Sequence, residues 1–239
     1  HDYLIGFVFF VGYFIVAGLP PILFKIYADT PFEITRKMYH LVITLSIFPL
    51  LKLFSPWYMA VLAIFTFVLI VYPVLALVEH APLYKRIAVE RGDGEFRRSF
   101  IIVELSLALL IFIFWGVLGV DWRYIAVVAV LAWGFGDAAA ALIGKAYGRR
   151  QISLPRIAGE KTVEGTLAMF VVAGITIFLT LLIYVGESWY VSFATALFVA
   201  PVCSAVELFS PRGTDTITVP LSAAFAILPL MSLFSFLGV

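Results

Sequence analysis

Apolar stretches long enough to cross a bilayer follow one another along almost the whole chain. A helix needs about 20 mostly apolar residues to cross the hydrocarbon region. Eight stretches approach this length: roughly 3–24, 38–54, 57–79, 99–119, 122–144, 165–185, 188–208 and 217–238. Their apolar residues run continuously rather than alternating, which favours helices over a β-barrel. The sequence therefore predicts an all-α polytopic membrane helix bundle with about eight transmembrane helices, of which 38–54 is the shortest.

The composition agrees with a membrane protein. Hydrophobic residues make up 63% of the 239 residues, against roughly 45–50% in a soluble domain. Since no long polar stretch separates the apolar ones, we expect a single integral-membrane domain, 1–239, surrounded by membrane lipids and without a nucleic-acid partner. The only cysteine, Cys203, excludes an internal disulfide and a thiolate metal cluster. An oligomer is compatible with the sequence but does not follow from it.

The basic residues are distributed unevenly between the connections. Fourteen of the 16 Lys and Arg residues fall in odd-numbered connections between the eight stretches. Such an excess marks the cytoplasmic side of a membrane protein. We therefore expect both termini on the extracytoplasmic side and an active site at the cytoplasmic face. The alternation supports eight spans, because removing the second would put Lys25, Arg36 and Lys37 opposite the later basic connections.

Asp137 falls inside the fifth predicted span. A carboxylate there costs about 2.5–3.5 kcal/mol on insertion scales, so it should face the bundle interior beside a cation or a donor. This makes Asp137 a candidate catalytic residue and metal ligand. Gly136, Ala140 and Gly144 form a stripe of small residues that lets another helix approach closely. The alternative is a helix packed through this small face, with Asp137 only hydrogen-bonded.

A polar cluster connects the fifth and sixth predicted spans. Its basic residues are Lys145, Arg149, Arg150, Arg156 and Lys161, and its other polar residues include Glu160, Thr162 and Glu164. Basic side chains and the free N–H groups of a helix start together form an anion site, because phosphate oxygens need several donors. The alternative is that the cluster fixes the topology or contacts anionic lipid headgroups. Topology needs no acids here, although Glu160 and Glu164 could pair with Lys161.

Two carboxylates, Glu207 and Asp215, surround a predicted tight turn before the last span. Magnesium takes oxygen ligands and is usually held by one or two carboxylates together with phosphate oxygens. Asp137 and Asp215, with Glu207 as a third candidate, could form such a set. The alternative is a polar capping turn in which Asp215 is the N-cap of the last helix.

A third polar cluster, Arg36 to His40, opens the second predicted span. The i,i+4 spacing places Arg36 and His40 on one helix face, with Lys37 beside them. A histidine near a cation could bind phosphate or move a proton, although a single histidine at a helix entrance is often structural. Glu104, inside the fourth span, has either a role with substrate or a buried partnership with Arg97 or Arg98.

Taken together, these clusters resemble the CTP-dependent lipid kinase family that includes dolichol kinase, phytol kinase and the fungal-type diacylglycerol kinase. The matching pieces are RKMYH at 36–40, GDAAAALIGKAYGRR at 136–150, GEKTVEG at 159–165 and ELFSPRGTDTITVPLSAA at 207–224. The central piece, within 134–165, is also similar to membrane cytidylyltransferases that make CDP-diacylglycerol. The motif of the last piece lies in 207–220. At one position this chain departs from it, because Asp215-Thr216 stands where this family often has an Asp-Asn pair.

The resemblance implies transfer of the γ-phosphoryl group of CTP to the hydroxyl of a lipid alcohol from the bilayer, such as a polyprenol, phytol or diacylglycerol. It implies that Asp137 and Asp215, supported by Glu207, hold Mg²⁺ on the triphosphate. The nucleotide-binding residues would be Arg36, Lys37, Lys145, Arg149, Arg150, Glu160, Lys161 and Thr162. Asp137 or His40 would act as base, and Glu160 or Glu164 would orient Lys161 or bind metal, with Glu164 counted among the catalytic residues.

Two other functions remain open at this point. A CDP-lipid synthase would join a lipid phosphate to the α-phosphorus of CTP, but the long signature of that family is missing near Asp215. A transporter would have its site near the bilayer midplane, often in repeated broken helices. Most of the charges in this chain gather instead at the predicted cytoplasmic edge.

Overall fold

The computed structural model describes residues 2–79, 81, 84, 95–153, 161–211 and 213–238. Within these ranges the regular structure is helical, apart from one isolated antiparallel bridge between Gln151 and Thr162. The prediction of an all-α chain is confirmed. The helices group into two compact units, 1–120 and 121–239, and each unit is described by itself. The expectation that 1–239 is one domain stays a prediction.

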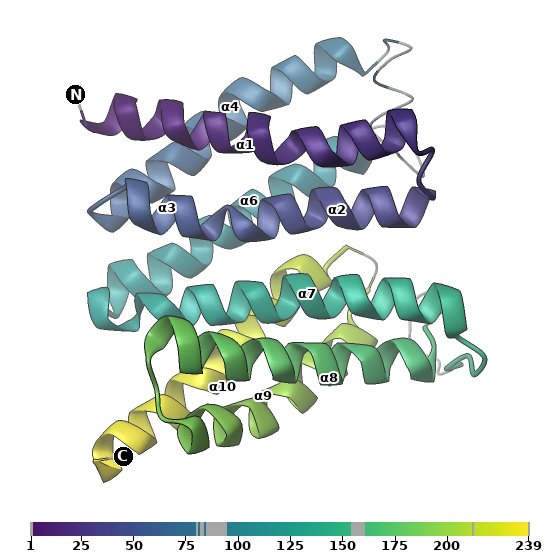
Figure 1. Cartoon of the computed structure of the whole chain (residues 1–239). Helices are drawn as coiled ribbons and strands as arrows, with labels where there is room; N and C mark the ends of the chain where they lie inside the picture. The colour runs from purple at the N-terminus through teal and green to yellow at the C-terminus, as the bar shows by residue number, and fades with distance from the viewer. Residues whose placement is uncertain are drawn as a thin grey trace. The chain divides into compact units, whose positions relative to one another are not determined.

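The first unit is held together by aromatic side chains. Its helices are α1 (Asp2–Tyr27), α2 (Phe32–Leu45), α3 (Ile47–Leu53), α4 (Trp57–Val78) and α6 (Glu95–Ile111), which continues as a π-helical segment, Phe112–Val117 (Figure 1). The Phe67 ring of α4 lies 5.3 Å from Phe10 and 4.4 Å from Phe14 of α1, and 5.6 Å from Phe100 of α6. Offset and edge-to-face ring pairs at these separations stabilise a core. Phe67 therefore connects three helices of this unit.

Seven helices in the described ranges are long and apolar enough to cross a membrane. They run over Asp2–Tyr27, Trp57–Val78, Phe96–Val117, Val120–Tyr147, Val163–Val185, Trp189–Phe209 and Asp215–Leu237. These helices indicate an integral, multi-pass membrane protein. They correspond to seven of the eight predicted spans, and the side on which the termini lie stays a prediction.

The predicted second span, 38–54, differs from the expectation of one continuous helix. The chain forms α2 and α3 instead, which are separated at Ser46. Pro49 has no N–H to donate to the carbonyl of Leu45, so the helical ladder lacks one hydrogen bond at this point. Pro49 lies in the first turn of α3, where a helix does not need the missing N–H. The Ser46 hydroxyl donates to the Ile43 carbonyl at 2.7 Å.

The second unit consists of four long helices, of which α7 is the most buried. They are α7 (Arg123–Tyr147), α8 (Val163–Leu179), α9 (Trp189–Phe209) and α10 (Asp215–Leu237), and α8 continues as a π-helical segment, Thr180–Val185. Helix α7 packs against α8 and α10, α8 packs against α9, and α9 packs against α10. Every residue of α7 from Ile125 to Gly134 is buried, so α7 is the central helix of this unit.

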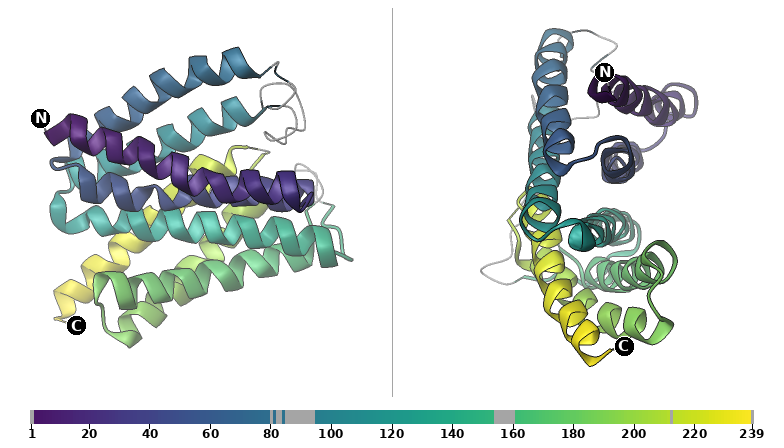
Figure 2. Two further views of the ribbon diagram at one scale, coloured as in Figure 1. Left: turned by 45° about the horizontal axis from the view of Figure 1, so that its top comes forward. Right: turned by 90° about the vertical axis from the view of Figure 1, so that its left-hand side faces the viewer.

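Helices α7 and α8 lie side by side along most of their length (Figure 2). A Cβ added at Gly136 would lie 2.5 Å from Sδ of Met169, and one at Gly165 would lie 2.8 Å from the Ala140 carbonyl oxygen. A Cβ at Gly144 would meet the start of α8 at 3.1 Å. The predicted stripe of small residues on α7 is therefore confirmed as the face that receives α8.

Candidate functional site

Two backbone hydrogen bonds join the described ends of the connection between α7 and α8, residues 150–152 and 161–163, which together we call the hairpin. The Val163 N–H donates to the Arg150 carbonyl at 3.0 Å, and the Ile152 N–H donates to the Lys161 carbonyl at 2.9 Å. Thr162 occupies the N-cap position of α8, and its hydroxyl oxygen accepts the Gly165 N–H at 3.1 Å. The hairpin thus places Arg150 beside the start of α8, next to Lys161.

Glu164, predicted as a catalytic residue, belongs to this hairpin. One of its carboxylate oxygens accepts the backbone N–H of Arg150 at 3.4 Å. A carboxylate in the first turn of α8 also interacts favourably with the helix dipole. These contacts hold Glu164 against the hairpin, and its catalytic role stays a prediction. Glu160 lies outside the described residues.

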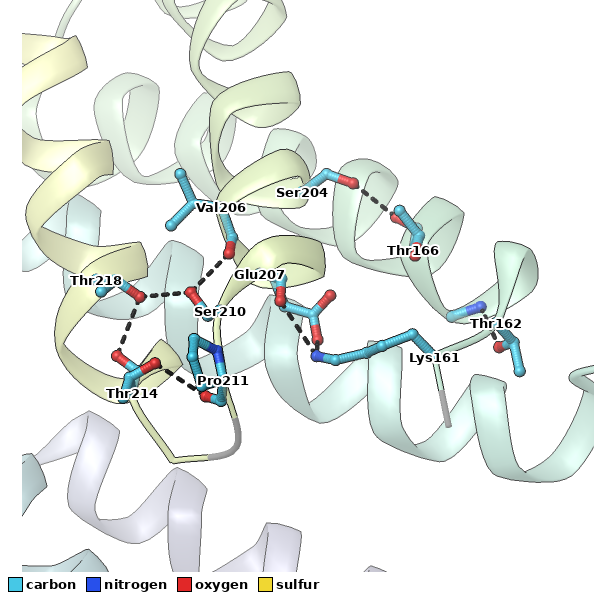
Figure 3. Close-up of polar contacts among 11 residues, drawn as sticks. Lys161, Thr162, Thr166, Ser204, Val206, Glu207, Ser210, Pro211, Thr214 and Thr218 are labelled. Atoms are coloured by element: carbon cyan, nitrogen blue, oxygen red, sulfur yellow. Dashed lines mark hydrogen bonds and ion pairs between the residues drawn. The ribbon is translucent and has the colours of Figure 1, made fainter. Parts of the chain in front are cut away.

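Lys161 joins the hairpin to the end of α9. Its ammonium group donates to the Glu207 carboxylate and, at 3.2 Å, to the Glu207 carbonyl oxygen (Figure 3). Glu207 is buried, with 4% of its surface exposed. Removing either partner would leave a poorly solvated charge. The sequence suggested Glu160 or Glu164 as the partner of Lys161, whereas the structure pairs Lys161 with a residue of another helix.

The turn between α9 and α10 is held by hydroxyl groups that the sequence did not single out. The Ser210 and Thr218 hydroxyls lie 2.7 Å apart, and the Thr214 hydroxyl donates to the Pro211 carbonyl at 2.9 Å (Figure 3). Ser, Thr, Pro and Gly are common turn residues, so the sequence predicted a turn here. It did not predict these hydrogen bonds between hydroxyl groups. The network fixes the direction in which α10 leaves the turn.

Asp215 is the first residue of α10, and Thr214 occupies the N-cap position. The suggestion that Asp215 itself is the N-cap is therefore wrong. Asp215 lies in the first turn, half-buried, with its negative charge at the positive end of the helix dipole.

Most of the predicted site residues of the second unit gather at one of its ends. This end comprises the end of α7, the start of α8, the end of α9 and the start of α10, and the Lys161–Glu207 pair joins its two connections. Arg149 and Arg150 are exposed there. Asp137 is half-buried within α7, on the same helix face as Lys145. At 1.5 Å per residue, these two side chains start about 12 Å apart along the helix axis.

The candidate metal ligands come from different helices. Asp137 belongs to α7 and Asp215 to α10, which pack against each other. Within the described ranges, no three His, Cys, Asp or Glu side chains are grouped closely enough to hold a metal ion. Glu207 is bonded to Lys161, so the structure does not assemble the predicted set of three carboxylates.

The remaining predicted residues belong to the first unit. Arg36, Lys37 and His40 all lie within α2, where the i,i+4 spacing puts Arg36 and His40 on one face. Nε of Arg36 donates to the Glu33 carboxylate at 3.1 Å, and Glu33 and Lys37 are each only 4% exposed. The nucleotide or proton-transfer role of these residues stays a prediction.

A cavity lies at the opposite end of the second unit. It has a volume of about 430 Å³, and its lining includes Asp121, Tyr124, Glu187 and Phe234. None of the predicted site residues lines it.

Comparison with known proteins supports one of the expectations directly. The chain is 30% identical over 131 residues to a phytol kinase of Synechocystis sp., and the alignment covers 55% of this chain and 54% of the relative. The chain thus spans about half the length of this curated relative. No family model matches the chain, and no solved structure matches it. The predicted resemblance is confirmed as a distant relationship to a phytol kinase.

Proposed function

We propose that this distant relative of a phytol kinase is a membrane-embedded kinase that transfers the γ-phosphoryl group of CTP to the hydroxyl of a lipid alcohol. The observation that carries the proposal is the Lys161–Glu207 pair, which joins the α7–α8 hairpin to the α9–α10 turn. This pair brings basic and acidic side chains that are far apart in the sequence together at one end of the second unit. Phosphoryl transfer needs this combination, because the protein mainly positions the reactants and neutralises charge.

The basic side chains at this end suit a triphosphate. Arg149 and Arg150 are exposed, and Lys145 and Lys161 flank them in the sequence. Guanidinium groups bind phosphate oxygens through paired, charge-assisted hydrogen bonds. The positive ends of the α8 and α10 dipoles add favourable potential for an anion. These residues would hold the nucleotide, and the preference for CTP follows from the resemblance.

The carboxylates at this end suit Mg²⁺ bound jointly with a nucleotide. Magnesium requires hard oxygen ligands and is commonly held by one or two carboxylates plus phosphate oxygens. Asp137 and Asp215 provide two carboxylates from adjoining helices. They would hold the ion, which when bound neutralises charge on the β- and γ-phosphates. Glu207 would support this site through Lys161.

The acceptor would enter from the bilayer with its chain between apolar helices and its hydroxyl at the cytoplasmic boundary. Asp137 or His40 would take the hydroxyl proton. The lipid class, whether polyprenol, phytol or diacylglycerol, is to be decided by assay.

The test is incubation of the purified protein with Mg²⁺, a panel of the three lipid alcohols, and CTP or ATP labelled on the γ-phosphate. We expect label in a phosphorylated lipid, and more with CTP than with ATP. A parallel reaction with CTP labelled in cytidine and phosphatidic acid tests the synthase alternative. Cytidine label in the lipid, or solute flux into proteoliposomes without any transfer, would contradict the proposal.

A further inference from the structure

The cavity at the opposite end of the second unit has a lining that the proposed kinase reaction does not use. Its volume is about 430 Å³, and its lining includes two acids, three aromatic residues and a methionine: Asp121, Glu187, Trp122, Tyr124, Phe234 and Met231. Small-molecule sites commonly have volumes of roughly 300–1,000 Å³ and combine apolar walls with a few polar groups. This cavity has the size and the mixed lining of such a site.

Glu187 reaches the cavity from the connection between α8 and α9. Gly186, just before it, ends the π-helical segment with a φ of 86°. Glycine adopts this left-handed conformation without steric cost. The backbone N–H groups of Gly186 and Glu187 both donate to the Leu181 carbonyl at 3.0 Å. The position of the Glu187 backbone is therefore fixed by the end of the preceding helix.

The charges around the cavity favour a cation. The part of the lining that the structure describes contains two carboxylates and no Lys or Arg. Arg123 is adjacent to Trp122 in the sequence but does not line the cavity. Phe234 lies in the last turn of α10, where the helix dipole is negative and no basic residue balances it.

The aromatic side chains favour an organic cation over a metal ion. The Trp122 and Tyr124 rings stack with their centroids 6.4 Å apart, and Phe234 provides a third ring. The faces of such rings attract alkylammonium groups. A divalent metal ion would instead need several oxygen ligands, and within the described ranges no three His, Cys, Asp or Glu side chains are grouped.

The cavity also lies close to the expected level of the lipid headgroups. Trp189 and Tyr190, which follow Glu187 closely in the sequence, begin α9 and are 66% and 48% exposed. Trp and Tyr are enriched at the two membrane–water interfaces, where their rings lie at headgroup level. A ligand in this cavity can therefore come from the bilayer surface as well as from solution.

We propose that this cavity binds an alkylammonium group, as is found in free choline and in the headgroup of phosphatidylcholine. Asp121 and Glu187 balance the positive charge, and the rings of Trp122 and Tyr124 contact the alkyl groups on the nitrogen. The inference goes beyond the proposed kinase function, because the two sites lie at opposite ends of the second unit and share no residue.

The test compares choline with its neutral analogue, in which a carbon atom replaces the charged nitrogen. Each compound is titrated calorimetrically onto the purified full chain in a non-ionic detergent. We expect choline to bind at least about tenfold more tightly than the analogue, because only choline has the charge that the rings and the carboxylates attract. Equal affinities for the two compounds would overturn the proposal.

Two variants test the acids of the cavity. Glu187→Gln and Asp121→Asn keep the shape of the side chain and remove its charge, so each should weaken choline binding and leave binding of the neutral analogue unchanged. Asp29→Asn is the matched control, since Asp29 is an exposed acid of the first unit with a φ of 42°, which asparagine also tolerates. Wild-type choline affinity in both cavity variants would overturn the proposal. So would displacement of choline by an equal concentration of Ca²⁺.

A second arm of the experiment distinguishes the two sources of the ammonium group. The protein is placed in nanodiscs of phosphatidylcholine or of digalactosyl diacylglycerol, a neutral lipid without an ammonium group, and choline is titrated again. If the headgroup occupies the cavity, choline binds at least about tenfold more weakly in the phosphatidylcholine discs, because the tethered group is present at a high effective concentration. Equal choline affinity in both discs assigns the cavity to a free ammonium compound.

Discussion

At the scale of single residues, Lys161 and Glu207 depend on each other. Lys161→Met leaves the buried Glu207 carboxylate without its cation. We expect a loss of about 2–3 kcal/mol of stability, somewhat less than the roughly 3–5 kcal/mol for a fully buried pair, because the Lys161 side chain is 23% exposed. Thermal unfolding in detergent would measure it.

The double substitution Lys161→Met with Glu207→Leu is the control for this prediction. Since it removes both charges together, it should recover most of the lost stability and still lack phosphoryl transfer. A single variant as stable as the wild type would contradict the importance of the pair.

Asp137 and Asp215 are expected to be needed for the reaction rather than for folding. Asp137→Asn and Asp215→Asn keep the side-chain volume but remove the charge that would hold Mg²⁺. We expect kcat to fall at least about 100-fold in each, as when electrostatic stabilisation is lost, with an unchanged melting temperature. Asp121→Asn, at the opposite end of the second unit, should keep full activity. Full activity in both site variants would remove the proposed metal site.

The sequence predicted which residues of the second unit gather at one end, but not how they pair. Lys161 and Glu207 are 46 residues apart, and only the packing of α8 against α9 brings them together. Nearby acids in the sequence therefore looked like better partners. The Glu164 carboxylate does not pair with Lys161 but accepts a hydrogen bond from the Arg150 backbone N–H. This contact forms only once the hairpin has formed, so no sequence pattern predicts it.

At the scale of elements, the close approach of α7 and α8 depends on glycine. Gly165→Ala would place a Cβ 2.8 Å from a carbonyl oxygen of the neighbouring helix, so one helix must shift. We expect a loss of about 1–3 kcal/mol, typical of overpacking, and reduced transfer because the hairpin is displaced. Thermal unfolding and the kinase assay would measure both effects.

Gly12→Ala in α1 provides the comparison for this prediction. A Cβ at Gly12 meets nothing within 4 Å, so this variant should unfold at the wild-type temperature or slightly above it, since alanine favours helix. Equal melting temperatures for Gly165→Ala and the wild type would show that the helices can move apart freely.

The apolar runs predicted the helices well, because span length and hydrophobicity are local properties of the sequence. The run at 57–79 became Trp57–Val78, and the run at 188–208 became Trp189–Phe209. The run at 38–54 did not become one helix: α2 and α3 are separated at Ser46, and Pro49 leaves out one hydrogen bond of the ladder just after this break. The π-helical ends of two other spans left no signal in hydrophobicity.

At the scale of the whole molecule, the eight-span topology can be tested by labelling single cysteines. Cys203 is buried and is first replaced by alanine. With eight spans, Asp29→Cys and Arg149→Cys should react with a membrane-impermeant thiol reagent from the cytoplasmic side, and Val120→Cys from the other side. If α2 and α3 do not cross the membrane, Asp29→Cys and Arg149→Cys will label from opposite sides, which would contradict the prediction.

The Lys161–Glu207 pair also affects which anions can bind at the charged end of the second unit. An arriving phosphate does not simply displace a mobile chloride ion, because the ammonium group already has a covalently tethered counterion. A tethered competitor acts at a high effective concentration that dilution cannot lower. Phosphate binding at this lysine is therefore an exchange reaction, which disfavours small anions of low charge and favours a polyphosphate that contacts several cations at once.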